Sequence, residues 1–289
     1  VHLMRAEFGE AERAWEQAVE HARAAGDLRG ELENLSWVPL AVWAGPTPAE
    51  RGLARCEEVL EGAKGDRKVR SSALFGRAGF EAMLGRFVDA RDSIAQARAL
   101  LEEIALTVWV AGPLTQVAGW VELLADDPAA AERELRWGFA TLQEIGEFSW
   151  LSTTASLLAE ALYEQGRYQE AEDFIETSRA AAASEDVYSQ VMWRSVLSKL
   201  LAERGDAEPA QSLARAAVTL TDPAEFPLLR CYVLLCLGEV LMLTGRPREA
   251  APAIEQAIRV SAEKGDVVSA QRGERLLEEL RRGQELTEL

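Results

Sequence analysis

The sequence is poor in the side chains on which enzymes and metal sites usually depend. Its 289 residues include two histidines, His2 and His21, and three cysteines without Cys-x-x-Cys spacing. A catalytic triad needs a histidine held by the structure around it, and a structural zinc site needs four Cys or His ligands. We therefore predict no catalytic residue and no metal site.

Phosphate-binding loops and paired carboxylates are also missing. No GxxxxGK[ST] or GxGxxG motif lies between a strand and a helix. The acidic pairs are adjacent on helices or turns and point apart, so they are interpreted as solvated charges: Glu57-Glu58, Asp126-Asp127 and Glu278-Glu279. We expect no cofactor and no enzymatic activity in this segment.

The sequence also shows no sign of disulfides, membrane spans or export signals. An odd number of cysteines without paired spacing is typical of a reduced protein. Charged residues interrupt every apolar stretch before the roughly 18 residues that a membrane helix needs. No signal peptide is visible. The sequence therefore predicts a cytoplasmic protein that does not bind membranes.

Basic residues are outnumbered, with 31 Lys and Arg against 48 Asp and Glu. The net charge of −17 repels phosphate backbones and anionic lipid, which argues against nucleic acid as a partner. We interpret the excess as a solvated acidic surface. An acidic site for a basic partner is the alternative.

What the sequence does have is a repeat. Seven times, an alanine follows a turn signal and opens a run of helix formers, at intervals of about 40 residues: Ala11, Ala49, Ala90, Ala131, Ala171, Ala210 and Ala250. A steady period over the whole chain indicates one supersecondary unit copied many times, which is a solenoid. The hydrophobic content of 48% is enough for a continuous core.

Each unit is predicted to be an antiparallel pair of helices, A then B. One domain covers residues 1–289, with a partial repeat at 1–25 and a capping helix at 267–282 whose charges lie on one side: Arg272, Glu274, Arg275, Glu278 and Glu279. We expect a frayed tail at 283–289. Six full pairs are expected between them, at 28–63, 68–104, 107–145, 148–183, 187–220 and 224–264. Because the array is already under way at residue 1, we expect a C-terminal piece of a longer protein.

Small residues lie twelve positions before five of the turn alanines: Ala78, Gly119, Ala159, Ser198 and Gly238. A bulky residue follows the alanine four positions later in most units, as Ile94, Leu135, Ile175 and Ile254. This is the tetratricopeptide arrangement, with helices longer than in the usual period of about 34 residues. The predicted fold is an all-α, tetratricopeptide-like right-handed α-solenoid of about seven helix-pair repeats.

Six of the eight tryptophans lie on predicted A helices, which line the concave groove of such arrays. We interpret them as core between repeats, and Trp120 as an exception that is at least partly exposed in the groove. The repeat register places eight candidate partner-binding residues there: Gln116, Trp120, Ser156, Glu160, Ser195, Lys199, Tyr232 and Glu239. The partner would be a protein or peptide segment, and a small-molecule effector is a further candidate.

Three segments, at 152–172, 190–218 and 238–272, resemble the C-terminal tetratricopeptide region of large actinobacterial signalling proteins. Residues 45–60 and 125–147 also fit that region. In those proteins a class III adenylate/guanylate cyclase domain and an AAA-type ATP-binding domain come first, and none of their catalytic motifs falls in this chain.

The resemblance implies a non-catalytic regulatory region, which upstream domains of the same chain could bind. The alternative is the sensor array of a large ATP-dependent transcriptional activator of the STAND type.

Overall fold

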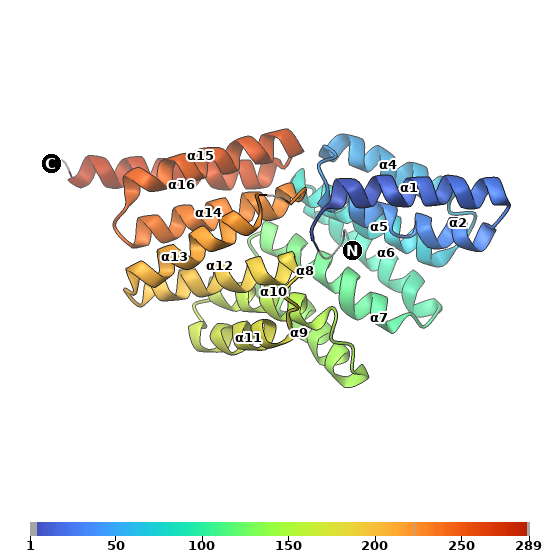
Figure 1. Cartoon of the computed structure of the whole chain (residues 1–289), viewed down its shortest axis with the longest axis horizontal. Coiled ribbons are helices and arrows are strands. Elements are labelled where there is room, and N and C mark those ends of the chain that lie inside the picture. Colours follow the sequence, from blue (N-terminus) through green and yellow to red (C-terminus); the bar gives the residue numbers. More distant parts are fainter. Residues whose placement is uncertain (1–4, 223, 288–289) are drawn as a thin grey trace.

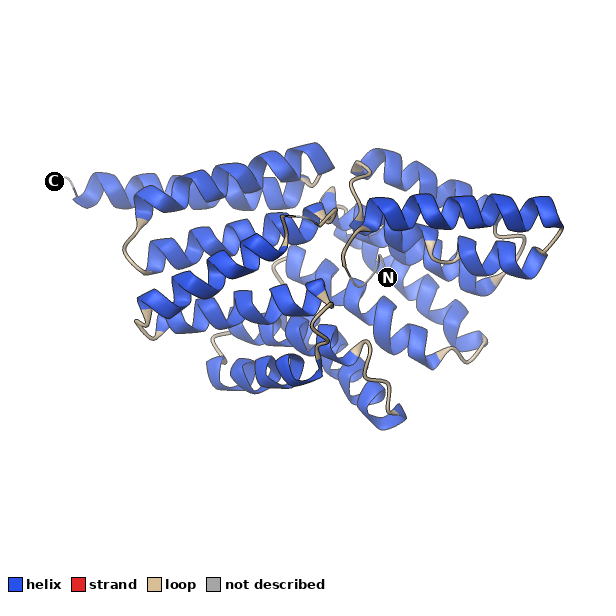
Figure 2. Ribbon diagram, in the orientation of Figure 1, coloured by secondary structure: helices blue, strands red, loops and turns tan. Residues whose placement is uncertain are grey.

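The computed structural model describes residues 5–222 and 224–287, with side chains described up to Gly283. The described residues form helices joined by short loops, and none of them is in a strand (Figure 2). The all-α, tetratricopeptide-like fold class is confirmed. It follows from apolar residues that recur every three to four positions along each segment.

Helices A and B alternate along the chain, and two A helices are interrupted. If each interrupted A helix is counted as one helix, the described residues form 14 helices, as the repeat count predicts. The segments are α1 (Phe8–Ala25), α2 (Leu28–Leu35), α3 (Val38–Ala44), α4 (Ala49–Gly62), α5 (Arg67–Met83), α6 (Phe87–Glu103), α7 (Thr107–Trp109), the π-helix η1 (Val110–Leu114), α8 (Thr115–Leu124), α9 (Pro128–Ile145), α10 (Leu151–Glu164), α11 (Tyr168–Ala181), α12 (Val187–Glu203), α13 (Ala207–Leu220), α14 (Pro227–Leu243), α15 (Pro247–Lys264) and α16 (Val267–Thr287).

Proline explains both interruptions. Pro39 lies in the first turn of α3, directly after the break from α2, and Pro113 lies inside η1. Proline has no N–H to donate and its ring crowds the preceding turn, so the helix either restarts or widens there. The final helix continues to Thr287, beyond the end expected at Arg282, and residues 288–289 lie outside the described part of the chain.

The predicted contact between small and bulky residues is present. A Cβ atom on Gly119 would lie 2.7 Å from a methyl carbon of Leu135, and one on Gly238 would lie 2.5 Å from Ile254. Ala159, at the equivalent position of its repeat, is fully buried. In these two repeats the B helix therefore packs a branched side chain against a glycine of its A helix.

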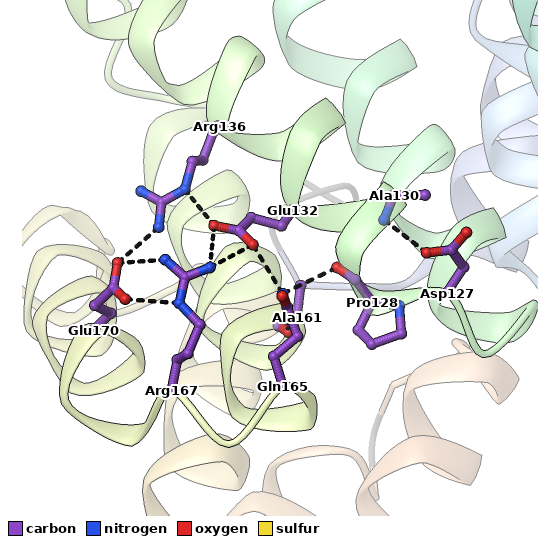
Figure 3. Close-up of polar contacts among 9 residues, drawn as sticks. All are labelled: Asp127, Pro128, Ala130, Glu132, Arg136, Ala161, Gln165, Arg167 and Glu170. Carbon is purple, nitrogen blue, oxygen red and sulfur yellow. Dashed lines mark hydrogen bonds and ion pairs between the residues drawn. The ribbon is translucent and has the colours of Figure 1, made fainter.

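Ion pairs join successive repeats at about one repeat period. Glu132 of α9 accepts hydrogen bonds from Arg136 of its own helix and, at 2.6 Å, from Arg167 at the start of α11 (Figure 3). Arg136 also reaches Glu170 of α11 at 2.9 Å. Burial alone would raise the pKa of Glu132, but these hydrogen bonds and one from Gln165 lower it below its usual value.

The array bends until its two ends meet. In Figure 1 the colours run from blue on the right, through green below, to red at the upper left, where α15 and α16 return beside α4. The ammonium group of Lys264, at the end of α15, donates to the carbonyls of Val42 (3.2 Å), Gly45 (2.6 Å) and Thr47 (2.6 Å). These acceptors lie at the end of α3 and in the segment between α3 and α4, more than 200 residues away.

A second contact closes the array near the start of α14. Phe8 and Phe226 pack edge to face with ring centroids 4.8 Å apart. The Glu225 N–H donates to the carbonyl of Ala6, and the Glu225 carboxylate accepts from the Glu10 N–H, both at 3.0 Å. The first and last repeats are thus neighbours in space.

The last helix differs from the expectation at one of its charged residues. The charged side of α16 was expected to face away from any neighbour, but Arg272 reaches Glu239 of α14 and Glu164 of α10. The expectation was wrong for Arg272 because its side chain lies on the inner face, where α10 and α14 present Glu164 and Glu239.

We expect Ala159→Leu to lower the free energy of unfolding by about 1–3 kcal/mol, because the larger side chain overpacks the contact between α10 and α11. Urea denaturation followed by circular dichroism measures this change. Ala95→Leu on the exposed face of α6 is the matched control and should lie near wild type. Equal stability of the two variants would contradict the repeat register.

We expect Lys264→Met to open the closure. Methionine cannot donate hydrogen bonds, so the carbonyls of Val42, Gly45 and Thr47 lose their bonds to residue 264. Burying a polar group without a partner costs on the order of 1–3 kcal/mol. Small-angle X-ray scattering should show a larger radius of gyration, and urea denaturation a lower stability. Arg259→Met, at an exposed position of the same helix, should change neither. Wild-type dimensions for Lys264→Met would mean that other contacts hold the two ends together.

Candidate binding site on the inner face

The A helices line the inside of the closed array, and side chains from distant repeats meet there. The indole N–H of Trp120, on α8, donates to the hydroxyl of Tyr188 on α12 at 2.5 Å. The ring of Tyr232, on α14, packs against the same indole at 5.8 Å with an interplanar angle of 89°. Three repeats therefore converge on Trp120.

Trp120 is less exposed than the sequence led us to expect. The expectation of a partly open indole was wrong, since the side chain is 8% exposed. In an open groove the ring would face solvent, but here Tyr188 and Tyr232 cover it from across the inner face. Its role in binding stays a prediction.

A charged cluster lies beside Trp120. The Lys199 ammonium on α12 donates to Glu160 of α10 at 2.6 Å, and both side chains are almost fully buried. The Tyr232 hydroxyl donates to the other oxygen of Glu160 at 2.7 Å. Burial raises the pKa of Glu160, and the cation and the hydroxyl oppose that shift. Burial also disfavours the charge of Lys199, but Glu160 and Glu164 raise its pKa above the ordinary value.

The cluster extends outward to α16. Glu164 accepts from Lys199 at 3.3 Å and from Arg272 at 3.4 Å, and Glu239 accepts from Arg272 at 3.1 Å. Burial would raise the pKa of Glu164, but the two cations lower it. Glu239 in turn raises the pKa of Arg272 above its ordinary value. Charges from four repeats are tied together in this way.

The structure brings together five of the eight candidates: Trp120, Glu160, Lys199, Tyr232 and Glu239. Gln116 lies one turn before Trp120 and donates to the Trp150 carbonyl and the Thr154 hydroxyl of the next repeat. The two serines stand apart from the cluster. Ser156 and Ser195 are buried, and each hydroxyl donates to a carbonyl of its own helix.

An apolar cavity of about 200 Å³ lies on one side of Trp120. We call it the aromatic cavity. Rings from the first, middle and last repeats line it: Phe8, Trp43, Trp120, Trp150, Tyr188 and Phe226. Gln116, Ser149, Thr153 and Asp186 supply its polar edge.

A second cavity, of about 240 Å³, lies between α8, α14 and α16. We call it the charged cavity. Trp120 and Tyr232 form its aromatic wall, and its charged residues are Asp126, Glu239, Asp266, Arg272, Arg275 and Glu279. A smaller space of about 40 Å³, also lined by Trp120 and Asp126, extends it to Glu160 and Glu164. Trp120 is therefore a wall of all three spaces.

Several lining residues were missed by the sequence analysis. Phe8, Phe226 and Trp43 come from repeats that face each other only because the array closes. Arg272 was placed on the outer face of α16, although its opposite charge to Glu239, one repeat period earlier, is a signal that could have paired them. Asp126 was interpreted as a solvated turn residue.

Four other tryptophans on A helices agree with the interpretation as core between repeats: Trp37, Trp43, Trp109 and Trp193. Trp37 stacks on Trp15 at 5.7 Å and packs on Trp109 at 4.9 Å, so rings from the partial repeat and from the units at 28–63 and 107–145 share one aromatic cluster. Trp43 and Trp193 are buried. All three cysteines are buried free thiols.

Two features are not found among the described residues. No group of three His, Cys, Asp or Glu side chains is arranged to hold a metal ion. No helix in the same part of the chain has both the length and the apolar character for crossing a membrane.

Comparison with known families identifies two repeats. The family model for the tetratricopeptide repeat matches residues 153–177 and 232–256. Each match begins in an A helix, crosses the glycine turn and ends in the B helix, and the two include Glu160, Tyr232 and Glu239. No curated protein sequence matches the chain.

Solved structures share the fold at low sequence identity. The quorum sensor NprR in complex with its cognate peptide NprX superposes with a TM-score of 0.60 at 16% identity, covering 93% of this chain and 83% of that one. A Rap protein complexed with Competence and Sporulation Factor has a TM-score of 0.60 at 14% identity, covering 96% and 88%. A tetratricopeptide repeat protein from Parabacteroides merdae has a TM-score of 0.52 at 14% identity, covering 94% and 99%.

We expect Lys199→Met to lower the free energy of unfolding by about 3–5 kcal/mol, since it leaves Glu160 buried without its cation. Adding Glu160→Gln should recover part of the loss, because no uncompensated charge then remains. Urea denaturation of the two single variants and the double variant measures the coupling. Arg67→Met, which removes the surface pair with Glu103, should cost at most about 1 kcal/mol. Additive losses in the double variant would contradict the pairing.

Proposed function

We propose that the chain is a non-catalytic, peptide-binding regulatory array. The observation that carries the proposal is the pair of cavities on either side of Trp120, on the inner face of the A helices. Their volumes suit side chains of an extended segment rather than a folded domain. The solved structure of NprR with its cognate peptide lends support, since it holds a peptide ligand on a related fold.

The aromatic cavity is the anchoring half of this proposed site. Aromatic rings bury a large apolar area and order few rotatable bonds, so they dominate binding energy in recognition sites. The polar edge supplied by Gln116 and Thr153 would orient the backbone of a bound segment. A small-molecule effector would use the same anchor and is the second candidate ligand.

Regulation would follow from where the aromatic cavity lies. Its walls come from α1 and α3 at one end of the array and from the segment before α14 at the other. A ligand that contacts both ends favours the closed array over any open form, by the difference in its affinity for the two. Binding would thereby change which surfaces of the end repeats are available to other domains.

We further propose that the parent protein is a cytoplasmic signalling protein with an ATP-binding domain and an adenylate/guanylate cyclase domain. The resemblance of residues 152–172, 190–218 and 238–272 to the helical region of such proteins supports this. A STAND-type transcriptional activator is the alternative. The flanking reading frame separates the two, because a cyclase domain before the array supports the first and a helix-turn-helix after it supports the second.

Peptide binding can be tested by filling the aromatic cavity. Random heptapeptides displayed on phage are selected on the immobilised protein, and the affinity of enriched peptides is measured by fluorescence anisotropy. Ser149 is an exposed loop residue at the cavity edge, so Ser149→Trp should fold and occupy the space. We expect it to weaken binding at least tenfold.

Ser184→Trp is the matched control, because Ser184 is an exposed loop residue that lines neither cavity. It should bind as wild type does. Failure to enrich any peptide, or equal binding by Ser149→Trp and wild type, would refute a peptide site in the aromatic cavity.

A further inference from the structure

Asp126 occupies a position that other repeats give to glycine. It follows α8 in the left-handed conformation, with φ of +60°, where the A helices α5, α10, α12 and α14 are followed by Gly85, Gly166, Gly205 and Gly245. Its N–H caps the helix by donating to the Leu123 carbonyl at 3.2 Å. Aspartate adopts this conformation more readily than most residues, so the turn keeps its shape while gaining a carboxylate.

The Asp126 carboxylate is free to act on a ligand. No hydrogen bond or ion pair to it is present among the described residues, and it lines both the charged cavity and its smaller extension. Its neighbour Asp127 has a structural task, accepting from the Ala130 N–H at the start of α9 (Figure 3). Of the two, only Asp126 faces the cavities without a partner.

The other charges of the site largely satisfy one another. Lys199 is held by Glu160 and Glu164, and Arg272 by Glu164 and Glu239. Asp266 caps α16 by accepting from the Ser269 N–H. On α16, Arg275 and Glu279 are exposed, carry opposite charges and lie one turn apart on the same face, with no ion pair to either among the described residues. The unbalanced charge at the mouth of the cavity is negative, on a chain of net charge −17.

The aromatic residues that line the charged cavity with Asp126 suit a cation as well. Trp120 and Tyr232 line the charged cavity, and aromatic faces attract ammonium and guanidinium groups. Within the site itself, the Lys199 ammonium already lies 5.9 Å from the Tyr232 ring. A small cavity lined by a carboxylate and by aromatic rings is a receptor for a basic side chain.

We infer that the bound peptide carries a basic side chain beside a large apolar one. The basic group enters the charged cavity against Asp126, and the apolar group enters the aromatic cavity. Because Trp120 is a wall of both, residues one or two positions apart can fill them, given a rise of about 3.3–3.6 Å per residue in an extended chain. This inference rests on the proposed function and adds the chemistry of its ligand.

The selection of displayed heptapeptides is repeated in parallel on three proteins: wild type, Asp126→Asn and Asp173→Asn. Asparagine keeps the shape and the left-handed conformation of residue 126 and removes its charge. Asp173 is an exposed residue of α11 that lines neither cavity, so it controls for the change in net charge. Asp126→Gly, which restores the residue of the other repeats, guards against a folding defect.

We expect wild type and Asp173→Asn to enrich peptides with Arg or Lys within two positions of a large apolar residue. Asp126→Asn and Asp126→Gly should keep the apolar preference and lose the basic one. An individual basic peptide should bind these two variants roughly 10- to 100-fold more weakly than it binds wild type, as expected for losing a charged hydrogen bond. Its affinity for wild type should fall as salt is added.

Two other outcomes distinguish the inference of a basic side chain from the proposed function of peptide binding. Enrichment of neutral or acidic peptides by wild type, or an unchanged basic preference in Asp126→Asn, overturns the inference and leaves peptide binding in place. Enrichment of no peptide at all removes the proposed function and the inference with it.

Discussion

The ammonium group of Lys264 is the contact on which the shape of the molecule depends. It is buried at the end of α15 and is surrounded by the carbonyls of Val42, Gly45 and Thr47. Burial lowers its pKa to about 7, and the carboxylates of Glu12 and Asp266 oppose that shift. An ammonium has three protons to donate, and three acceptors meet it here. Together with the packing of Phe8 on Phe226, this interaction joins the last repeat to the first and closes the array.

Closure decides what the inner face can be. In an open array each repeat contacts only its neighbours, and the A helices form a groove. Here Trp120 contacts Tyr188 and Tyr232, which lie two and three repeats away. The groove is reduced to two cavities with an indole between them. A site of this kind accepts a few side chains and is sensitive to small movements of any of the repeats that line it.

The buried charges make the inner face more specific and less tolerant of change. Glu160, Lys199 and Tyr232 satisfy one another in a region with little water, where an unpaired charge is costly. The pairs on the outer face, such as Arg136 with Glu170, lie at least partly in solvent and contribute less each. Ion pairs between repeats thus cover much of the acidic surface. The Asp126 carboxylate has no such partner among the described residues and lines the charged cavity.

The sequence by itself determined the repeat. Its period, the glycine turns and the contacts of Gly119 with Leu135 and Gly238 with Ile254 are local features, because each depends on residues within one unit. The same register brought Glu160, Lys199, Tyr232 and Glu239 to one face, since equivalent positions stack in successive repeats. Only the tertiary structure decided that the array closes. Closure depends on a small rotation between successive repeats, which adds up over the whole chain. It also depends on backbone carbonyls as acceptors, and these cannot be identified from the sequence because every residue has one. For that reason the cover over Trp120 and the cavity shared by Phe8 and Phe226 could not be read from the residues alone.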